Sequence, residues 1–352
     1  MIQKGLALGA SAAVIASGFA LPASAAGLAD TSFVSLAPSA GTEYAVLAGA
    51  GKTFTLRANE ASTVTTGNLK FLVEDANGNF FPTATSTGVT YADAGAALTS
   101  WPRTNGTVTL TFASASHGLT AGEIFAIETA LDSTTPADED VAVGYYTVAS
   151  VSSATVTFVD GGDDVTVGAS ALVGAFGQSN IVRAASGNFV VDSGVASSAT
   201  NEDLELATMS TSTVSAVVTA FKDANANGSI DSTEYASPVR TVQFIKGSEV
   251  TATLTTDPYI VGAAHSTATA YVTTTPALNG NFMSTGDVVV RFTHQGSASN
   301  YDVNATFNTT SRKWSASSSY APTPNTIAAG THTVAARIGT TTVSPVTTLT
   351  VV

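Results

Sequence analysis

The chain has 352 residues, a net charge of −13 and no cysteine. This charge argues against nucleic acids and anionic membrane surfaces as partners, and it favours bound cations. Without cysteine no disulfide can staple the fold, so apolar cores or bound metal must stabilise it.

Only 11% of the residues are charged, and small and β-branched residues dominate. Such a composition suits many short strands and turns, so we expect an all-β fold. The length is too great for one ordinary domain and fits two or three.

The N-terminus has the three parts of a secretory signal peptide. Lys4 precedes an apolar run, and Ala23-Ser24-Ala25 forms a small-residue cleavage site. A membrane helix is the alternative, but the run is shorter than the roughly 20 apolar residues that a span needs. We therefore expect export, with residues 1–25 removed, and no membrane span in the remaining chain.

Two pairs of similar segments suggest that one fold is used twice, although simple sequence of this kind can also match by chance. "TTGNLKFLVED" (65–75) resembles "STGDVVVRFTH" (284–294), and "ASPVRTVQF" (236–244) resembles "VSPVTTLTV" (343–351). The first copy is about 112 residues longer between these segments. This surplus is enough for a small inserted domain, and exposed loops tolerate such insertions.

The predicted organisation is therefore a tandem pair of immunoglobulin-like β-sandwiches, the first interrupted by an inserted small β domain. The first sandwich comprises residues 26–85 and 185–247, the inserted domain residues 86–184, and the second sandwich residues 248–352. The insertion has ten acidic and two basic residues, a balance of −8, and strand patterns at 108–112, 145–151 and 154–159. Its acidic segments "PADEDV" and "DGGDD" are either a solvated surface or weak calcium sites.

One motif in the first sandwich carries metal chemistry. "DANANGSIDSTE" (223–234) matches the calcium loop of an EF-hand at every position, yet it lies between two β-patterned stretches, 214–221 and 239–244. Calcium prefers six to eight oxygen ligands, and alternate residues of a tight loop can wrap them round one point. Gly228 allows the positive φ that the wrap requires. The predicted ligands are Asp223, Asn225, Asn227, Ser229 through its carbonyl, Asp231 through water, and Glu234 through two oxygens.

The alternative for this loop is an empty polar hairpin. The matching segment of the second copy is only the short "RIGTTTVSP" (337–345), so calcium would pin a loop that replaces a simple turn. The related "EDANGNF" (74–80) lacks the closing acid, and its Asn-Gly pair predicts a plain hairpin turn instead.

No catalytic motif stands out. "GAGKT" (49–53) lacks the first glycine of a phosphate loop, the four histidines have no metal-binding spacing, and there is no cysteine nucleophile. We therefore expect no enzymatic activity, although two carboxylates from distant loops could still form a glycosidase site.

Together these features resemble bacterial surface-layer and related cell-envelope structural proteins. The resemblance implies an extracellular, cell-surface protein that self-associates into a layer or filament, with calcium rigidifying its domains. The alternative is an adhesin or glycan-binding surface module, in which the insertion presents the recognition face to cell-envelope glycans.

Overall fold

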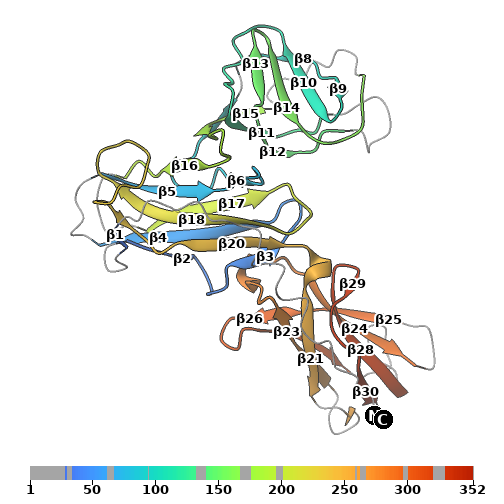
Figure 1. Cartoon of the computed structure of the whole chain (residues 1–352). Coiled ribbons are helices and arrows are strands. Elements are labelled where there is room, and N and C mark those ends of the chain that lie inside the picture. Colours follow the sequence, from blue (N-terminus) through green and yellow to red (C-terminus); the bar gives the residue numbers. More distant parts are fainter. Residues whose placement is uncertain are drawn as a thin grey trace, which may run out of the picture.

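The computed structural model of the chain describes most of the sequence, namely residues 28–29, 34–61, 67–93, 95–131, 140–166, 176–195, 201–257, 260–261, 267–295, 300–319 and 330–351. The predicted signal peptide, residues 1–25, lies outside the described residues. The described part is all-β, with two short 3₁₀ turns and no α-helix. None of its helical segments has the length and apolar character needed to cross a bilayer. Figure 1 shows three β units in a row, with the inserted unit and the second sandwich at opposite ends.

The first sandwich, in the middle of the row, packs two sheets face to face. The smaller sheet has the order β2-β4-β17-β6, formed by Val34–Pro38, Thr53–Glu60, Asn201–Thr208 and Phe80–Pro82. In the larger sheet β18 (Val214–Asp223) pairs with β5 (Asn68–Glu74) on one side and with β20 (Arg240–Ile245) on the other. Four shorter strands complete that sheet: β1 (Leu28–Ala29), β3 (Ala45–Leu47), β16 (Phe189–Asp192) and β19 (Tyr235–Ala236).

Alternating burial explains why these segments are strands. In β5 every second residue is buried, with Leu69, Phe71 and Val73 all fully covered. These side chains meet those of the facing sheet in one apolar core. The inward face of each strand therefore holds the sandwich together, as the period-2 pattern predicts.

The inserted unit is a second pair of sheets with its own core. One sheet contains β8 (Leu98–Ser100), β9 (Arg103–Thr104), β10 (Thr107–Phe112), β13 (Ser150–Ser152) and β14 (Thr155–Val159). The other contains β7 (Tyr91–Asp93), β11 (Glu123–Ile127), β12 (Gly144–Thr147) and β15 (Phe176–Val182). The single strand expected at 145–151 is wrong. The chain changes sheets at Val148 and Ala149, so this stretch contributes to two strands.

The second sandwich has the same two-layer design. One sheet has the order β21-β23-β27-β26, formed by Thr251–Asp257, Thr267–Thr275, Lys313–Ser319 and Thr306–Asn308. The other contains β22 (Ile260–Val261), β24 (Val288–His294), β25 (Asn300–Asn304), β28 (Gly330–Ile338), β29 (Thr341–Thr342) and β30 (Thr347–Val351).

In the strand pairing, the matching segments lie at equivalent places in the two sandwiches. The middle of the larger sheet runs β5-β18-β20-β3 in the first and β24-β28-β30-β22 in the second. In both, the last strand of the unit is antiparallel to its central neighbour and parallel to an early strand. The two sandwiches therefore share this strand order.

The insertion changes the order in which two strands are used. In the second sandwich β25, which pairs with β24, precedes β26. In the first sandwich β6 is the equivalent of β26, and it comes before the insertion. The equivalent of β25 is β16, which pairs with β5 and follows the insertion. The hairpin expected at 74–80 is accordingly wrong: β5 and β6 lie in different sheets, and the turn between them crosses from one layer to the other.

Polar contacts fix the joint between the two sandwiches. The Lys52 ammonium lies 2.6 Å from the Asp287 carboxylate. The fully buried Asn279 donates from Nδ2 to the carbonyls of Ala40 (2.8 Å) and Glu43 (2.9 Å). Arg312 pairs with the Glu43 carboxylate across the same joint. The second sandwich is thus held against loops of the first rather than hung on a free linker.

Candidate functional site

The predicted calcium loop joins two paired strands. β18 ends at Asp223 and β19 begins at Tyr235, and the two strands pair at Phe221 and Ala236. The expectation that strands rather than helices flank this loop is confirmed. All six predicted ligand residues lie in the described part of the chain.

In the first half of the loop, side-chain oxygens accept hydrogen bonds from backbone N–H groups further along. Asp223 accepts from Asn227 (3.1 Å) and Gly228 (2.8 Å), Asn225 accepts from Asn227 (3.1 Å), and Asn227 accepts from Ser229 (2.7 Å). Gly228 has a φ of +73°, as the motif predicts. These bonds curl the backbone round its own side chains.

The second half closes the curl. Asp231 Oδ2 accepts from the side-chain amides of Asn225 (2.6 Å) and Asn227 (3.0 Å), so three predicted ligands meet at one oxygen. Glu234 accepts from the N–H of Ala224 (2.7 Å) through one oxygen and from that of Asp231 (3.0 Å) through the other. The closing glutamate therefore ties the start of the loop to its end.

The donor set of the loop fits calcium in its chemistry. Asp223, Asp231 and Glu234 offer carboxylate oxygens, and Asn225 and Asn227 present oxygens when their amides rotate by half a turn. In the described residues, however, no group of three His, Cys, Asp or Glu side chains is placed to hold a metal ion. The structure brings Asn225, Asn227 and Asp231 together and leaves the full ligand set a prediction.

Lys70 is a component of this loop that the sequence analysis missed. Its ammonium lies 2.9 Å from Asp223 and 3.2 Å from Asp192, and the Asp223 side chain is fully buried. Burial alone would raise the pKa of Asp223, but Lys70 and the N–H groups of Gly228 and Asn227 outweigh it and lower that pKa. The first predicted ligand is thus held ionised beside a lysine.

An apolar side chain anchors the loop to the sheet. Ile230 is buried against Phe221 and Ala236, with Leu72 and Val190 packed round them. Because the loop covers this outer face, β18 is buried on both faces from Val218 to Asp223 instead of alternating. The motif includes Ile230, but its spacing does not reveal the surface on which the residue packs.

A buried ion pair lies at the same end of the sandwich. Lys222 points between the two sheets, and its ammonium is 2.6 Å from the carboxylate of Glu60 at the end of β4. Both side chains are 1% exposed. The residues that lead into the loop are therefore tied to both sheets.

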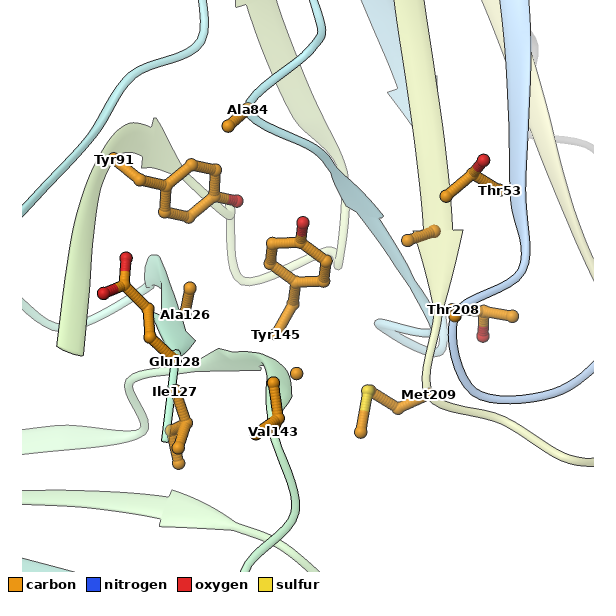
Figure 2. Close-up of a pocket in the computed structure, with 13 residues that line it drawn as sticks. Thr53, Ala84, Tyr91, Ala126, Ile127, Glu128, Val143, Tyr145, Thr208 and Met209 are labelled. Atoms are coloured by element: carbon orange, nitrogen blue, oxygen red, sulfur yellow. The ribbon is translucent and has the colours of Figure 1, made fainter. Parts of the chain in front are cut away.

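The structure also contains a hollow that the sequence does not indicate. It lies between the inserted unit and the first sandwich, has a volume of about 360 Å³, and is shown in Figure 2. Tyr91 and Tyr145 line it from the insertion, with ring centroids 5.6 Å apart. Met209, just after β17, lines it from the sandwich side. Its rings and thioether come from segments that are distant in sequence, so no local pattern could mark it.

The tyrosines of this hollow are held in a shielded environment. The Tyr91 hydroxyl donates to the carbonyl of Pro82 (2.8 Å), and the Tyr145 ring stacks on Phe81 at 6.1 Å between centroids. Burial raises the pKa of Tyr145, and the charge of Glu205 raises it further. Burial likewise raises the pKa of Tyr91.

Comparison with known proteins yields structural neighbours only. No protein-family model and no curated protein sequence matches the chain. One structural match is the major pilin subunit BcpA of Bacillus cereus, at 6% identity and a TM-score of 0.20, covering 91% of this chain. The chain spans only 66% of that pilin's length.

Two further matches are of the same quality. One is a C-terminal fragment of the major pilin GBS80 of Streptococcus agalactiae, at 7% identity and a TM-score of 0.19, covering 90% of this chain and 91% of the fragment. The other is the type II cohesin dyad of the adaptor ScaA scaffoldin of Acetivibrio cellulolyticus, at 8% identity and a TM-score of 0.22, covering 86% and 88%. Scores this low support no conclusion about partners or function.

Proposed function

We propose that the chain is an exported structural protein of the cell surface that self-associates into a layer or filament. The observation that carries the proposal is the joint between the sandwiches. There Lys52–Asp287, Arg312–Glu43 and the buried Asn279 hold two β-sandwiches as one extended body. An assembly unit must keep its shape between contacts, and a joint of this kind supports that requirement.

Calcium supplies rigidity at the other end of the first sandwich in this proposal. Asp223, Asn225, Asn227, Asp231, Glu234 and the carbonyl of Ser229 would hold the ion. Bound calcium supplies a divalent charge that offsets the repulsion among the carboxylates of the loop. The loop has no flanking helices to move apart, which favours a structural role over sensing.

The test of self-association is electron microscopy and sedimentation of the chain without residues 1–25, with millimolar calcium and with a chelator. We expect assemblies of regular spacing that require calcium. A chain that stays monomeric at high concentration in millimolar calcium would rule out the layer or filament.

The test of the metal site is thermal unfolding across a calcium titration. A ligand at about 100 times its Kd stabilises the folded state by roughly 2.7 kcal/mol. Glu234→Gln removes one charge and weakens the two-oxygen closure with little change of shape, so it should lose most of this gain. Equal midpoints for both proteins at every calcium concentration would make the loop an ordinary hairpin.

A second candidate function is a surface module that binds a ligand between the insertion and the first sandwich. The hollow of Figure 2 favours it, because small-molecule sites are commonly apolar clefts at domain boundaries with a few polar groups. This candidate predicts that the monomeric chain binds a ligand with saturable affinity.

A further inference from the structure

The hollow between the inserted unit and the first sandwich depends on a close contact between the two units. Gly144 of the insertion lies against Met209 of the sandwich: a Cβ on Gly144 would stand 2.2 Å from the Met209 sulfur. A glycine here therefore allows the methionine to reach the insertion and form one wall of the hollow. The cavity, about 360 Å³, has room for one small organic group.

The lining is rich in groups that attract cations. Tyr91 and Tyr145 contribute aromatic rings, whose faces carry partial negative charge. Met209 adds a polarisable thioether. Figure 2 shows the two rings and Met209 around the same space, with Glu128 below Tyr91.

The charge at the hollow is negative. Glu128 is the one charged residue in its lining, is exposed, and forms no hydrogen bond or ion pair with any other described residue. The charge of Glu205 also reaches Tyr145. The nearby cations are already paired, Lys52 with Asp287 at 2.6 Å and Arg183 with Asp75 at 3.2 Å. The charge of Arg183 reaches Tyr91, but Glu128 is the charge in the lining itself, so a positive ligand would meet a carboxylate that no described cation pairs with.

Other ligand classes fit this chemistry less well. A sugar needs a partner for each hydroxyl that it buries, whereas the Tyr91 hydroxyl is committed to Pro82 and Thr208 accepts from Ser210. An anion would be repelled by Glu128. A neutral apolar molecule would shield that carboxylate from water without pairing it.

We infer that the hollow between the insertion and the first sandwich binds an organic ammonium group, with Tyr91, Tyr145 and Met209 round its apolar part and Glu128 as its counter-ion. The inference rests on the second candidate function and is independent of calcium and of self-association. The ammonium group belongs either to a small quaternary amine or to a lysine side chain of another protein.

The experiment titrates the chain without residues 1–25 by calorimetry and by tyrosine fluorescence, using two cation probes. Tetramethylammonium represents the free amine and Nα-acetyl-lysinamide the lysine side chain. Their neutral counterparts of similar size are tert-butanol and Nα-acetyl-norleucinamide, and maltose tests for sugar binding.

We expect at least one cation to bind about tenfold more tightly than its neutral counterpart, and the stronger of the two identifies the source. Equal affinity for cation and neutral probe would overturn the inference, as would binding of maltose alone or of no probe. The assembly assay reads self-association separately, so failure here leaves that proposal standing.

Matched variants locate the binding. Glu128→Gln, on the surface, should weaken binding of the cation about tenfold, whereas Asp163→Asn, an exposed carboxylate of the insertion outside the lining, should leave it unchanged. Equal losses in Glu128→Gln and Asp163→Asn would mean attraction to an acidic surface and would contradict a defined site.

Discussion

The two sandwiches differ in chemistry at one end of their central strand pair. Leu69 pairs with Lys222 in the first sandwich, and Val288 pairs with Ile338 at the equivalent position in the second. Lys222 and Ile338 are both buried, at 1% and 5% exposure. The same place in the same fold is thus filled by an ion pair in one copy and by an apolar side chain in the other.

The difference follows from what each end must support. In the second sandwich a two-residue turn, with Gly339 at a φ of +55°, connects β28 to β29. In the first, the twelve-residue loop 223–234 begins there. Two ion pairs hold the base of that loop. Lys222–Glu60 lies between the two sheets, and Lys70–Asp223 lies on the outer face of the larger sheet. An apolar end suffices for a simple turn, and a long polar loop is held at its base by buried charge pairs.

Removing one partner of the buried pair should have the largest effect. Lys222→Met removes the ammonium that lies 2.6 Å from the buried Glu60 carboxylate, which should cost roughly 3–5 kcal/mol of unfolding free energy. Urea unfolding, followed separately for each sandwich, measures it. Glu60→Gln combined with Lys222→Met should recover part of the loss, because no uncompensated charge remains.

The control lies in the second sandwich. Arg291 and Asp302 form an exposed pair 2.6 Å apart, and Arg291→Met should cost only about 0–1 kcal/mol. Similar losses from Arg291→Met and Lys222→Met would show that the buried pair plays no special part in holding the loop.

The repeat itself supplies a sharper pair of substitutions. Gly67 and Gly286 stand at matching positions, and both have positive φ, +82° and +95°. A Cβ on Gly67 would lie 2.1 Å from the carbonyl oxygen of Asp223, whereas on Gly286 its nearest neighbour would be the Asn304 side chain at 3.7 Å. Gly67→Ala should therefore destabilise its sandwich by roughly 1–3 kcal/mol more than Gly286→Ala destabilises the other.

Thermal unfolding of the two variants measures this difference. Since both substitutions share the cost of a left-handed backbone, subtracting one from the other leaves the contact with the loop. Equal costs would mean that the start of the loop 223–234 can shift to accommodate the added methyl group and does not depend on Gly67.

The sequence could predict what depends on local pattern. Strand periodicity, the two matching segments and the glycine of the calcium motif act within a few residues, and the all-β class, the repeat and the φ of Gly228 follow from them.

Features that depend on pairing between distant strands could not be predicted. In the sequence, Lys70 is one polar residue of an alternating strand. The pairing of Lys70 with Phe221 brings it beside Asp223, and this pairing cannot be predicted from local pattern. The turn 74–80 has the sequence of a hairpin, yet its strands belong to different sheets. The hollow needs Tyr91, Tyr145 and Met209 to meet across two units. In each case the information lies in tertiary contacts rather than in spacing.

Substitution of Lys70 should give the smallest of the expected effects, and it tests the predicted calcium site directly. In the second sandwich Val289 occupies its position, so the lysine accompanies the copy with the calcium motif. The Lys70 ammonium and a calcium ion would both contact the buried Asp223 carboxylate. Because the two positive charges would then be close together, the lysine opposes binding of the ion. Lys70→Met should therefore raise calcium affinity about tenfold, equivalent to roughly 1.4 kcal/mol, while lowering the stability of the calcium-free protein.

Asp192→Asn supplies the opposite change. It removes the second partner of Lys70, 3.2 Å away, and leaves the ammonium on Asp223 alone, so calcium affinity should fall. Calorimetric titration of calcium into both variants separates the two explanations for Lys70. If the lysine only orders the loop, both substitutions loosen it and both weaken calcium binding. If its charge competes with the ion, the two affinities move in opposite directions, because one variant removes the competing charge and the other concentrates it on the first ligand.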